Sequence, residues 1–131
     1  QLLRDNQDVR LVIKEFPILS QSSLVAAKAA IAAEMQGKFS AYHIAMMTYR
    51  GQITDDVVIR LAVQAGVDEK QLKIDMESPK TAAIIQRTRE AAAALEISGT
   101  PGLVVGDTVI PGAIGYDEMV KLIVEERNNQ G

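Results

Sequence analysis

Apolar residues follow an extended pattern near the N-terminus and a helical pattern through the middle of the chain. Residues 9–16 are rich in β-branched and aromatic side chains and contain the continuous apolar run Leu11-Val12-Ile13. A continuous run of this kind predicts a strand that is covered on both faces. The pattern therefore predicts a strand over 9–16, ended by Pro17, and an Ala-rich helical block from Ser22 to Leu95.

Five consecutive helices are predicted within this block. Thr54, Asp68 and Ser78 are typical N-cap residues, because a short side-chain oxygen can accept a hydrogen bond from the first helical turn. Gly37 and Gly66 are typical helix ends. The predicted helices cover residues 22–36, 38–50, 55–65, 69–76 and 79–95. We expect them to pack as one unit over one end of the sheet and to bury Val58, Leu61 and either Ile84 or Ile85.

The last third of the chain changes pattern. Two short β-branched runs, 103–105 and 108–110, are separated by Gly106-Asp107, which predicts a tight hairpin. Apolar positions at helical spacing then predict a final helix from Tyr116, with 125–131 polar and frayed. Residues 1–6 are typical of the last turns of a helix, so we expect natural sequence before Gln1. This order of elements predicts an α/β fold.

Composition narrows the possible function classes. The chain has 131 residues, 47% of them hydrophobic, a formal net charge of −3 and no Cys. This length fits one domain, and the charge balance argues against nucleic acid or an anionic membrane surface as the main partner. The sequence contains no signal peptide and no apolar run long enough for a membrane span. The absence of Cys excludes a disulfide framework, a thiolate metal site and a cysteine nucleophile within these residues.

The remaining chemistry-bearing residues form no catalytic constellation. His43 is the one histidine and has no partner at metal-ligand spacing, so we interpret it as a packed or half-exposed structural residue. The serines at 20–23 are interpreted as loop and helix-cap residues. Thr100-Pro101 lies between Gly99 and Gly102 at the start of the hairpin. From the residues alone this proline is trans, since only about one in twenty X–Pro bonds in folded proteins is cis.

A family resemblance changes this interpretation. The run from Gly99 to Asp107, with Ile110-Pro111-Gly112-Ala113 after it, resembles the C-terminal half of a DsbA-type thioredoxin-fold oxidoreductase. Lys14-Glu15-Phe16-Pro17-Ile18-Leu19 resembles the second strand of that family and the loop after it. Five segments in the middle of the chain resemble the inserted helical domain of that family: Gln36-Gly37-Lys38-Phe39, His43, Ala45-Met46, Gly66-Val67-Asp68 and Asp75-Met76. The resemblance implies a thioredoxin-like fold, with residues 1–21 and 96–131 as the thioredoxin-like part and 22–95 as the insertion.

The resemblance also implies a site. Thr100-Pro101 would be the cis-proline pair beside the redox centre, and Gly99, Thr100 and Pro101 would bind an extended substrate strand. The family needs a Cys-x-x-Cys motif at a helix N-terminus, which this chain lacks. We therefore expect the first strand and the motif to lie upstream of Gln1, and the 131 residues to be inactive without them. Glu15 is a candidate for tuning a thiol pKa, or else caps the strand end in solvent.

The function implied is thiol–disulfide exchange on protein or peptide substrates, with a redox partner protein, in a periplasmic or other extracytoplasmic location. No metal or cofactor is implied. Two alternatives stay open. One is an enzyme similar to kappa-class glutathione transferases and related isomerases, which need no Cys-x-x-Cys. The other is a cysteine-free peptide-binding module of thioredoxin-like fold.

Overall fold

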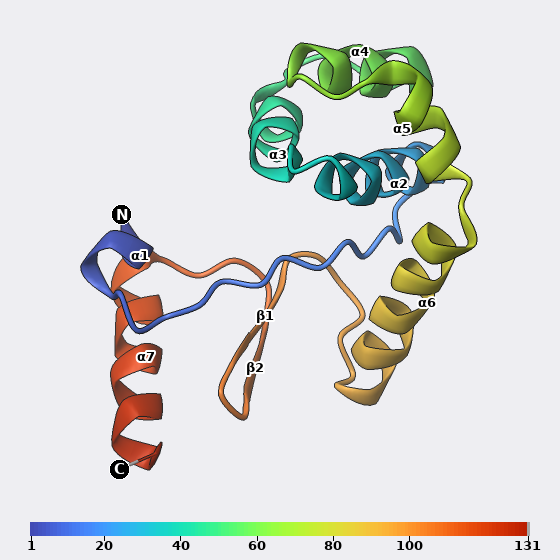
Figure 1. Cartoon of the computed structure of the whole chain (residues 1–131). Coiled ribbons are helices and arrows are strands. Elements are labelled where there is room, and N and C mark those ends of the chain that lie inside the picture. The colour runs from blue at the N-terminus through green and yellow to red at the C-terminus, as the bar shows by residue number, and fades with distance from the viewer. Residues whose placement is uncertain (131) are drawn as a thin grey trace. The chain divides into compact units, whose positions relative to one another are not determined.

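The computed structural model describes residues 1–130 as seven helices and one two-stranded sheet (Figure 1). In chain order the elements are α1 Leu2–Asp5, α2 Gln21–Met35, α3 Phe39–Thr48, α4 Asp55–Gln64, α5 Glu69–Met76, α6 Pro79–Ala94, β1 Gly102–Val105, β2 Thr108–Pro111 and α7 Tyr116–Gln130. The chain divides into two compact units. One runs over residues 15–90, where we predicted an insertion over 22–95, and the other joins residues 1–14 to those from 91 onward.

The five helices predicted for the middle of the chain are confirmed, and the predicted caps begin three of them. The Thr54 hydroxyl accepts a hydrogen bond from the Val57 N–H at 3.3 Å before α4. The Asp68 carboxylate accepts one from the Gln71 N–H at 2.7 Å before α5. Ser78 caps α6 in the same way. These bonds satisfy N–H groups that have no partner inside the helix. The start of each helix is therefore determined by residues that are close together in the sequence.

Small side chains on α2 build the core of the unit 15–90. Helices α3, α4 and α5 all contact α2, and Figure 1 shows them gathered around it. Alanine permits this because it keeps a helix backbone close to its neighbours. The buried residues that α2 contributes are Ala27, Ala29, Ala30, Ile31, Ala32 and Ala33. Tyr42 of α3 is also buried, and its hydroxyl donates to the Ala26 carbonyl at 3.2 Å, which satisfies the one polar atom it brings into the core.

The apolar positions expected in this core are buried. Val58 is 0% exposed, Leu61 7% and Ile85 4%, while Ile84 is half-buried. Thr81 connects the start of α6 to α5. Its side chain is fully buried, and its hydroxyl donates a hydrogen bond to the Asp75 carbonyl at 2.6 Å. The helical unit thus has both an apolar core and a polar anchor where two of its helices meet.

We expect Leu61→Ala to lower the free energy of unfolding by about 2–5 kcal/mol, since it leaves a cavity in the core. Val63→Ala is the matched control on the same helix, because Val63 is 42% exposed and loses little burial. Denaturant melts of both variants measure the difference. Equal losses for the two variants would contradict this assignment of the core face.

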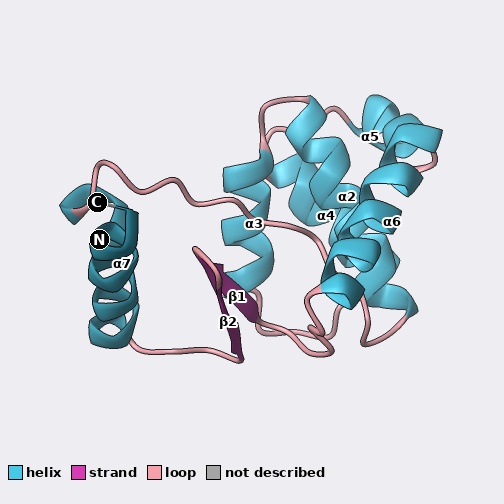
Figure 2. Cartoon of the chain, turned by 90° about the horizontal axis from the view of Figure 1, so that it is seen from below, coloured by secondary structure: helices cyan, strands magenta, loops and turns pink. Residues whose placement is uncertain are grey.

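The predicted hairpin is confirmed in the other unit. Strands β1 and β2 are antiparallel, with Val105 opposite Thr108 and Leu103 opposite Ile110. Gly106 has a φ of +55°, which glycine adopts at low steric cost in a two-residue hairpin turn. Helix α7 contacts β1. Figure 2 shows β1 and β2 as the strands in the described part of the chain.

Polar contacts tie the N-terminal residues to α7. The Tyr116 hydroxyl donates to the Asp5 carboxylate at 2.7 Å. Nε of Arg127 donates to the Asp8 carboxylate at 2.7 Å, and an Nη2 N–H donates to Asn6 Oδ1 at 3.1 Å. The predicted fraying from residue 125 is wrong for residues 125–130, because Arg127 is held in place and the helix continues to Gln130. Gly131 lies outside the described residues.

The predicted strand over 9–16 is also wrong: this segment is a loop with no strand pairing. Leu11, Val12 and Ile13 are 62%, 55% and 44% exposed. A strand forms only when a neighbouring strand accepts and donates its main-chain hydrogen bonds, and within residues 1–130 the two strands pair with each other. The apolar run therefore has the composition of a buried strand without the partner that would make it one.

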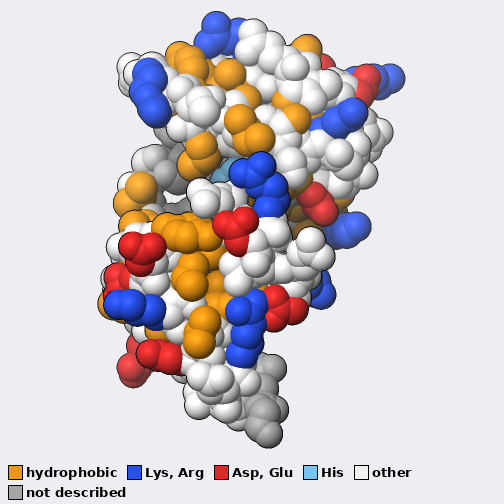
Figure 3. Space-filling view, turned by 90° about the vertical axis from the view of Figure 1, so that its left-hand side faces the viewer, with side chains coloured by type: hydrophobic (Ala, Val, Ile, Leu, Met, Phe, Trp, Pro, Cys, Tyr) orange, Lys and Arg blue, Asp and Glu red, His pale blue; other side chains and the backbone are white. Residues whose placement is uncertain are grey.

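Further apolar side chains reach the surface of the same unit. Leu3 of α1 and Val124 of α7 are each 43% exposed. Figure 3 shows hydrophobic side chains between acidic and basic ones on the face that carries these two helices. Within residues 1–130, no helix has both the length and the apolar content that crossing a membrane requires.

We expect the 131-residue chain alone to associate, because an exposed apolar segment with unpaired main-chain groups templates another strand. Val12→Lys should reduce this association, since a charge on an open strand edge opposes pairing. Sedimentation velocity of the two forms tests the expectation. A monomeric, cooperatively folded parent chain would show that these residues need no additional strand.

Candidate functional site

The end of α6 has an unusual backbone for its sequence. The Ile97 N–H donates to the Ala92 carbonyl at 2.8 Å and the Glu96 N–H to the Ala93 carbonyl at 3.1 Å. This is the Schellman pattern, which requires a left-handed residue, and Glu96 supplies it with a φ of +55°. An L side chain in this region costs of order 1 kcal/mol. The chain therefore holds Glu96 at a position that favours glycine.

The loop after α6 packs closely on the start of β1. A Cβ added to Gly102 would lie 2.6 Å from Cγ2 of Ile97, so only glycine allows this approach. The Thr100–Pro101 peptide bond is cis, as the family resemblance implied. The Gly112 N–H donates to the Pro101 carbonyl at 2.9 Å, which extends the hairpin by one main-chain bond beyond β1 and β2. The loop is thereby fixed to both strands.

A cavity of about 450 Å³ lies beside this loop. Most of its lining side chains are apolar or small, and among the described residues that line it Glu96 alone has an ionisable side chain. The lining residues are Leu95, Glu96, Ile97, Ser98, Gly99, Thr100, Pro101, Val109, Pro111 and Gly112. The site is therefore an apolar hollow with a single carboxylate.

The structure brings together three of the four candidate residues. Gly99, Thr100 and Pro101 are exposed and line this cavity. Sequence reasoning missed Glu96 as a lining residue, because a left-handed glutamate leaves no signal in a single sequence. It also missed Pro111, although the segment from Ile110 to Ala113 carried part of the resemblance and could have indicated it.

Glu15 is the fourth candidate and belongs to the compact unit 15–90. It is half-buried, and burial raises the pKa of its carboxyl above the ordinary value. Burial also raises the pKa of Tyr42, with a further contribution from the nearby Glu15 carboxylate. The alternative that Glu15 caps a strand end in solvent is wrong, because no strand forms here and the side chain is partly enclosed.

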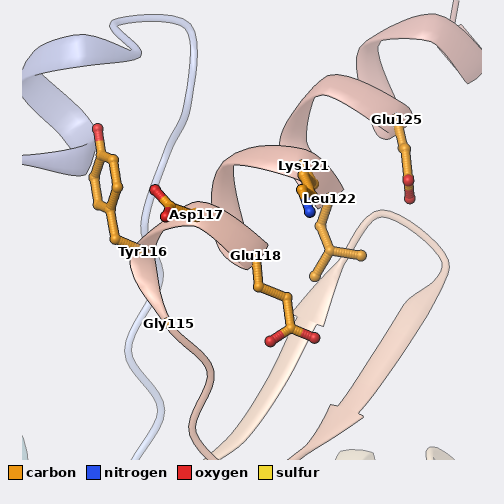
Figure 4. Close-up of a pocket in the computed structure, with 7 residues that line it drawn as sticks. All are labelled: Gly115, Tyr116, Asp117, Glu118, Lys121, Leu122 and Glu125. Carbon is orange, nitrogen blue, oxygen red and sulfur yellow. The ribbon is translucent and has the colours of Figure 1, made fainter.

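A second hollow lies at the start of α7 (Figure 4). It measures about 620 Å³, and its lining includes Asp117, Glu118, Lys121 and Glu125. Within residues 1–130, no group of three or more His, Cys, Asp or Glu side chains is placed to hold a metal ion. The charged lining therefore forms no metal site.

The other residues considered from the sequence have structural places. His43 is half-buried on α3, and its ring stacks on Phe39 with the centroids 5.3 Å apart, which confirms the interpretation as a packed histidine. The Ser20 hydroxyl accepts a hydrogen bond from the Ser23 N–H at 3.2 Å, which confirms the interpretation as a helix cap.

Comparison with known families accounts for the loop and the hairpin. The sequence profile of the DSBA-like thioredoxin domain matches residues 1–124. The chain belongs to this family. Its helix-rich α/β fold with a small sheet is that of thioredoxin-like DsbA proteins, as the resemblance implied.

Solved structures with this fold include two oxidoreductase-like proteins. A thioredoxin-like oxidoreductase from Silicibacter pomeroyi is 38% identical, with a TM-score of 0.93 over 97% of this chain and 73% of that one. A thiol-disulfide exchange protein from Wolbachia pipientis is 27% identical, with a TM-score of 0.80 over 87% of this chain and 63% of that one.

The match to a curated relative covers a shorter part of the chain. The Bacillus subtilis protein YwbO is 34% identical over 77 residues, which are 57% of this chain and 38% of that protein. The chain thus spans well under half of this relative. Within the DSBA-like family this chain is consistent with thiol–disulfide chemistry, but its 131 residues contain no Cys to perform it.

The raised pKa of Glu15 predicts a pH dependence of stability. A carboxyl whose folded-state pKa lies above its unfolded value stabilises the fold below the unfolded value, about 4.3, and loses that contribution as pH rises through the folded value. Glu15→Gln should therefore unfold at a higher denaturant concentration than the parent at neutral pH, and this difference should disappear at about pH 4.

Asp8 provides the control with the opposite sign. A hydrogen bond from Arg127 lowers the pKa of the Asp8 carboxyl, so its contribution is present above the unfolded pKa and is lost as pH falls. Asp8→Asn should therefore be less stable to denaturant than the parent, and this loss of stability should be largest at neutral pH. A gap between Glu15→Gln and the parent that does not change with pH would contradict the burial of Glu15.

Proposed function

We propose that this chain is the substrate-binding and structural part of a protein thiol–disulfide oxidoreductase whose redox cysteines lie outside the 131 residues. The observation that carries the proposal is the exposed loop of Gly99, Thr100 and Pro101 at the rim of an apolar cavity, in a chain of the DSBA-like family. An extended peptide offers main-chain groups to such a loop and apolar side chains to such a hollow, which gives affinity with little sequence preference.

The unpaired residues 11–13 support the expectation of a further strand. They are apolar, exposed and in the same compact unit as the hairpin. In the proposed whole protein, a strand that carries the Cys-x-x-Cys motif at its end covers them and places the thiols beside Thr100. Glu15, with its raised pKa, is proposed as a residue that tunes the pKa of a thiol of that motif.

The proposed exchange proceeds in two steps. One thiolate of the motif attacks a substrate disulfide, so that one S–S bond breaks, a mixed disulfide forms and a substrate thiolate leaves. The second thiolate of the motif then attacks the mixed disulfide and releases the other substrate sulfur. The substrate gains two electrons and becomes a dithiol, and the motif becomes a disulfide. The reverse direction oxidises a substrate dithiol, and a redox partner protein resets the motif in either case.

An extracytoplasmic location accompanies this proposal, since disulfide exchange on folding proteins belongs to oxidising compartments.

An insulin-reduction assay tests the proposal on a longer form that includes the upstream strand and the motif. We expect activity in the longer form and none in the 131-residue chain. In the longer form, Thr100→Arg should reduce kcat/KM for a protein substrate by about tenfold, which corresponds to about 1.4 kcal/mol of lost binding free energy. The same substitution should leave kcat/KM for a small dithiol substrate unchanged.

The matched control is Thr108→Arg, since Thr108 is exposed on the same hairpin and does not line the cavity. Equal losses in both variants would argue against a substrate site at Thr100. An inactive longer form that binds glutathione would favour the transferase-like alternative. An inactive longer form without glutathione affinity would favour the peptide-binding module.

A further inference from the structure

The charge of the cavity beside the loop comes from one side chain. Glu96 is exposed, and no hydrogen bond or ion pair joins its carboxylate to another described residue. The rest of the described lining is uncharged. A ligand that enters the hollow therefore meets one free carboxylate at an apolar surface.

The backbone under Glu96 is one that elsewhere in this chain is occupied by glycine. Helix α2 ends with the Lys38 N–H donating to the Ala33 carbonyl at 2.8 Å, with Gly37 at a φ of +68°. Helix α4 ends with the Val67 N–H donating to the Ala62 carbonyl at 3.1 Å, with Gly66 at a φ of +89°.

Three helices thus end in the same Schellman pattern, and two of them use glycine at the left-handed residue. The third uses Glu96 and accepts the steric cost of a side chain there. A residue held in an unfavourable conformation beside a cavity points to a role of its side chain.

We infer that Glu96 is a specificity-determining residue that favours substrate segments with a Lys or Arg side chain beside the part seated in the hollow. The inference rests on the proposed function, because it assigns a charge preference to the same peptide site. A carboxylate at a partly exposed rim attracts a cation modestly and is screened by salt. Its main effect is therefore discrimination between peptides and not overall affinity.

Peptide binding measured by fluorescence anisotropy tests the inference. The probes are two fluorescein-labelled peptides of Ser, Ala and Val that differ only in a central Lys or Glu. We expect the parent protein to bind the Lys peptide about threefold more tightly, with the preference lost at high salt. Glu96→Gln should bind both peptides equally, and Glu96→Lys should invert the preference.

Glu125→Gln is the matched control, since it removes the same charge from α7 outside this cavity. It should keep the parent's preference. Glu96→Gly should lose the preference and raise the melting temperature, because glycine removes the strain of the left-handed residue. A merely structural Glu96 would instead give a lower melting temperature in this variant.

The outcomes separate the inference from the proposed function. If the parent binds both peptides equally, or if Glu96→Gln keeps the discrimination, the inference is overturned and the peptide site stands. If neither peptide binds the parent, both are overturned.

Discussion

Main-chain hydrogen bonding is the constraint on which the rest of this structure depends. A helix satisfies its own N–H and C=O groups, whereas an extended segment needs a neighbour. The unit 15–90 consists of helices and builds its core around the alanines of α2. In the described part of the other unit, two strands pair with each other and the apolar run at 11–13 pairs with neither. The same rule therefore gives one unit with a complete core and one with unpaired extended backbone.

Three helix ends differ in the residue that occupies their left-handed position. Gly37 and Gly66 end α2 and α4 with the residue that the backbone favours, and both are far in sequence from the candidate site. Glu96 ends α6 with a residue that the backbone disfavours, beside a cavity. The hydrogen bonds follow the same pattern at all three helix ends. The ends differ in the side chain at the left-handed residue, because only Glu96 carries one and it lines a cavity.

Local signals in the sequence predicted much of the fold. The caps at Thr54, Asp68 and Ser78 act within a few residues, so they could be read without any tertiary contact. The hairpin at Gly106-Asp107 is equally local. The candidate loop at 99–101 was found by family resemblance, since proline in a loop has no unique meaning on its own. The cavity next to it was not predicted, because it forms only where the loop after α6 meets β2 and Gly112.

The sequence by itself determined the helices, the hairpin and the absence of a cysteine nucleophile, because each follows from neighbouring residues or from composition. Tertiary structure decided that residues 9–16 form a loop and not a strand, since a strand needs a neighbouring strand that composition alone cannot supply. It decided that α7 continues past residue 125, because Arg127 meets Asp8 and Asn6 from the far end of the chain. It also decided the environment of Glu15 and Glu96, since burial and strain arise only when distant segments or special backbone angles come together.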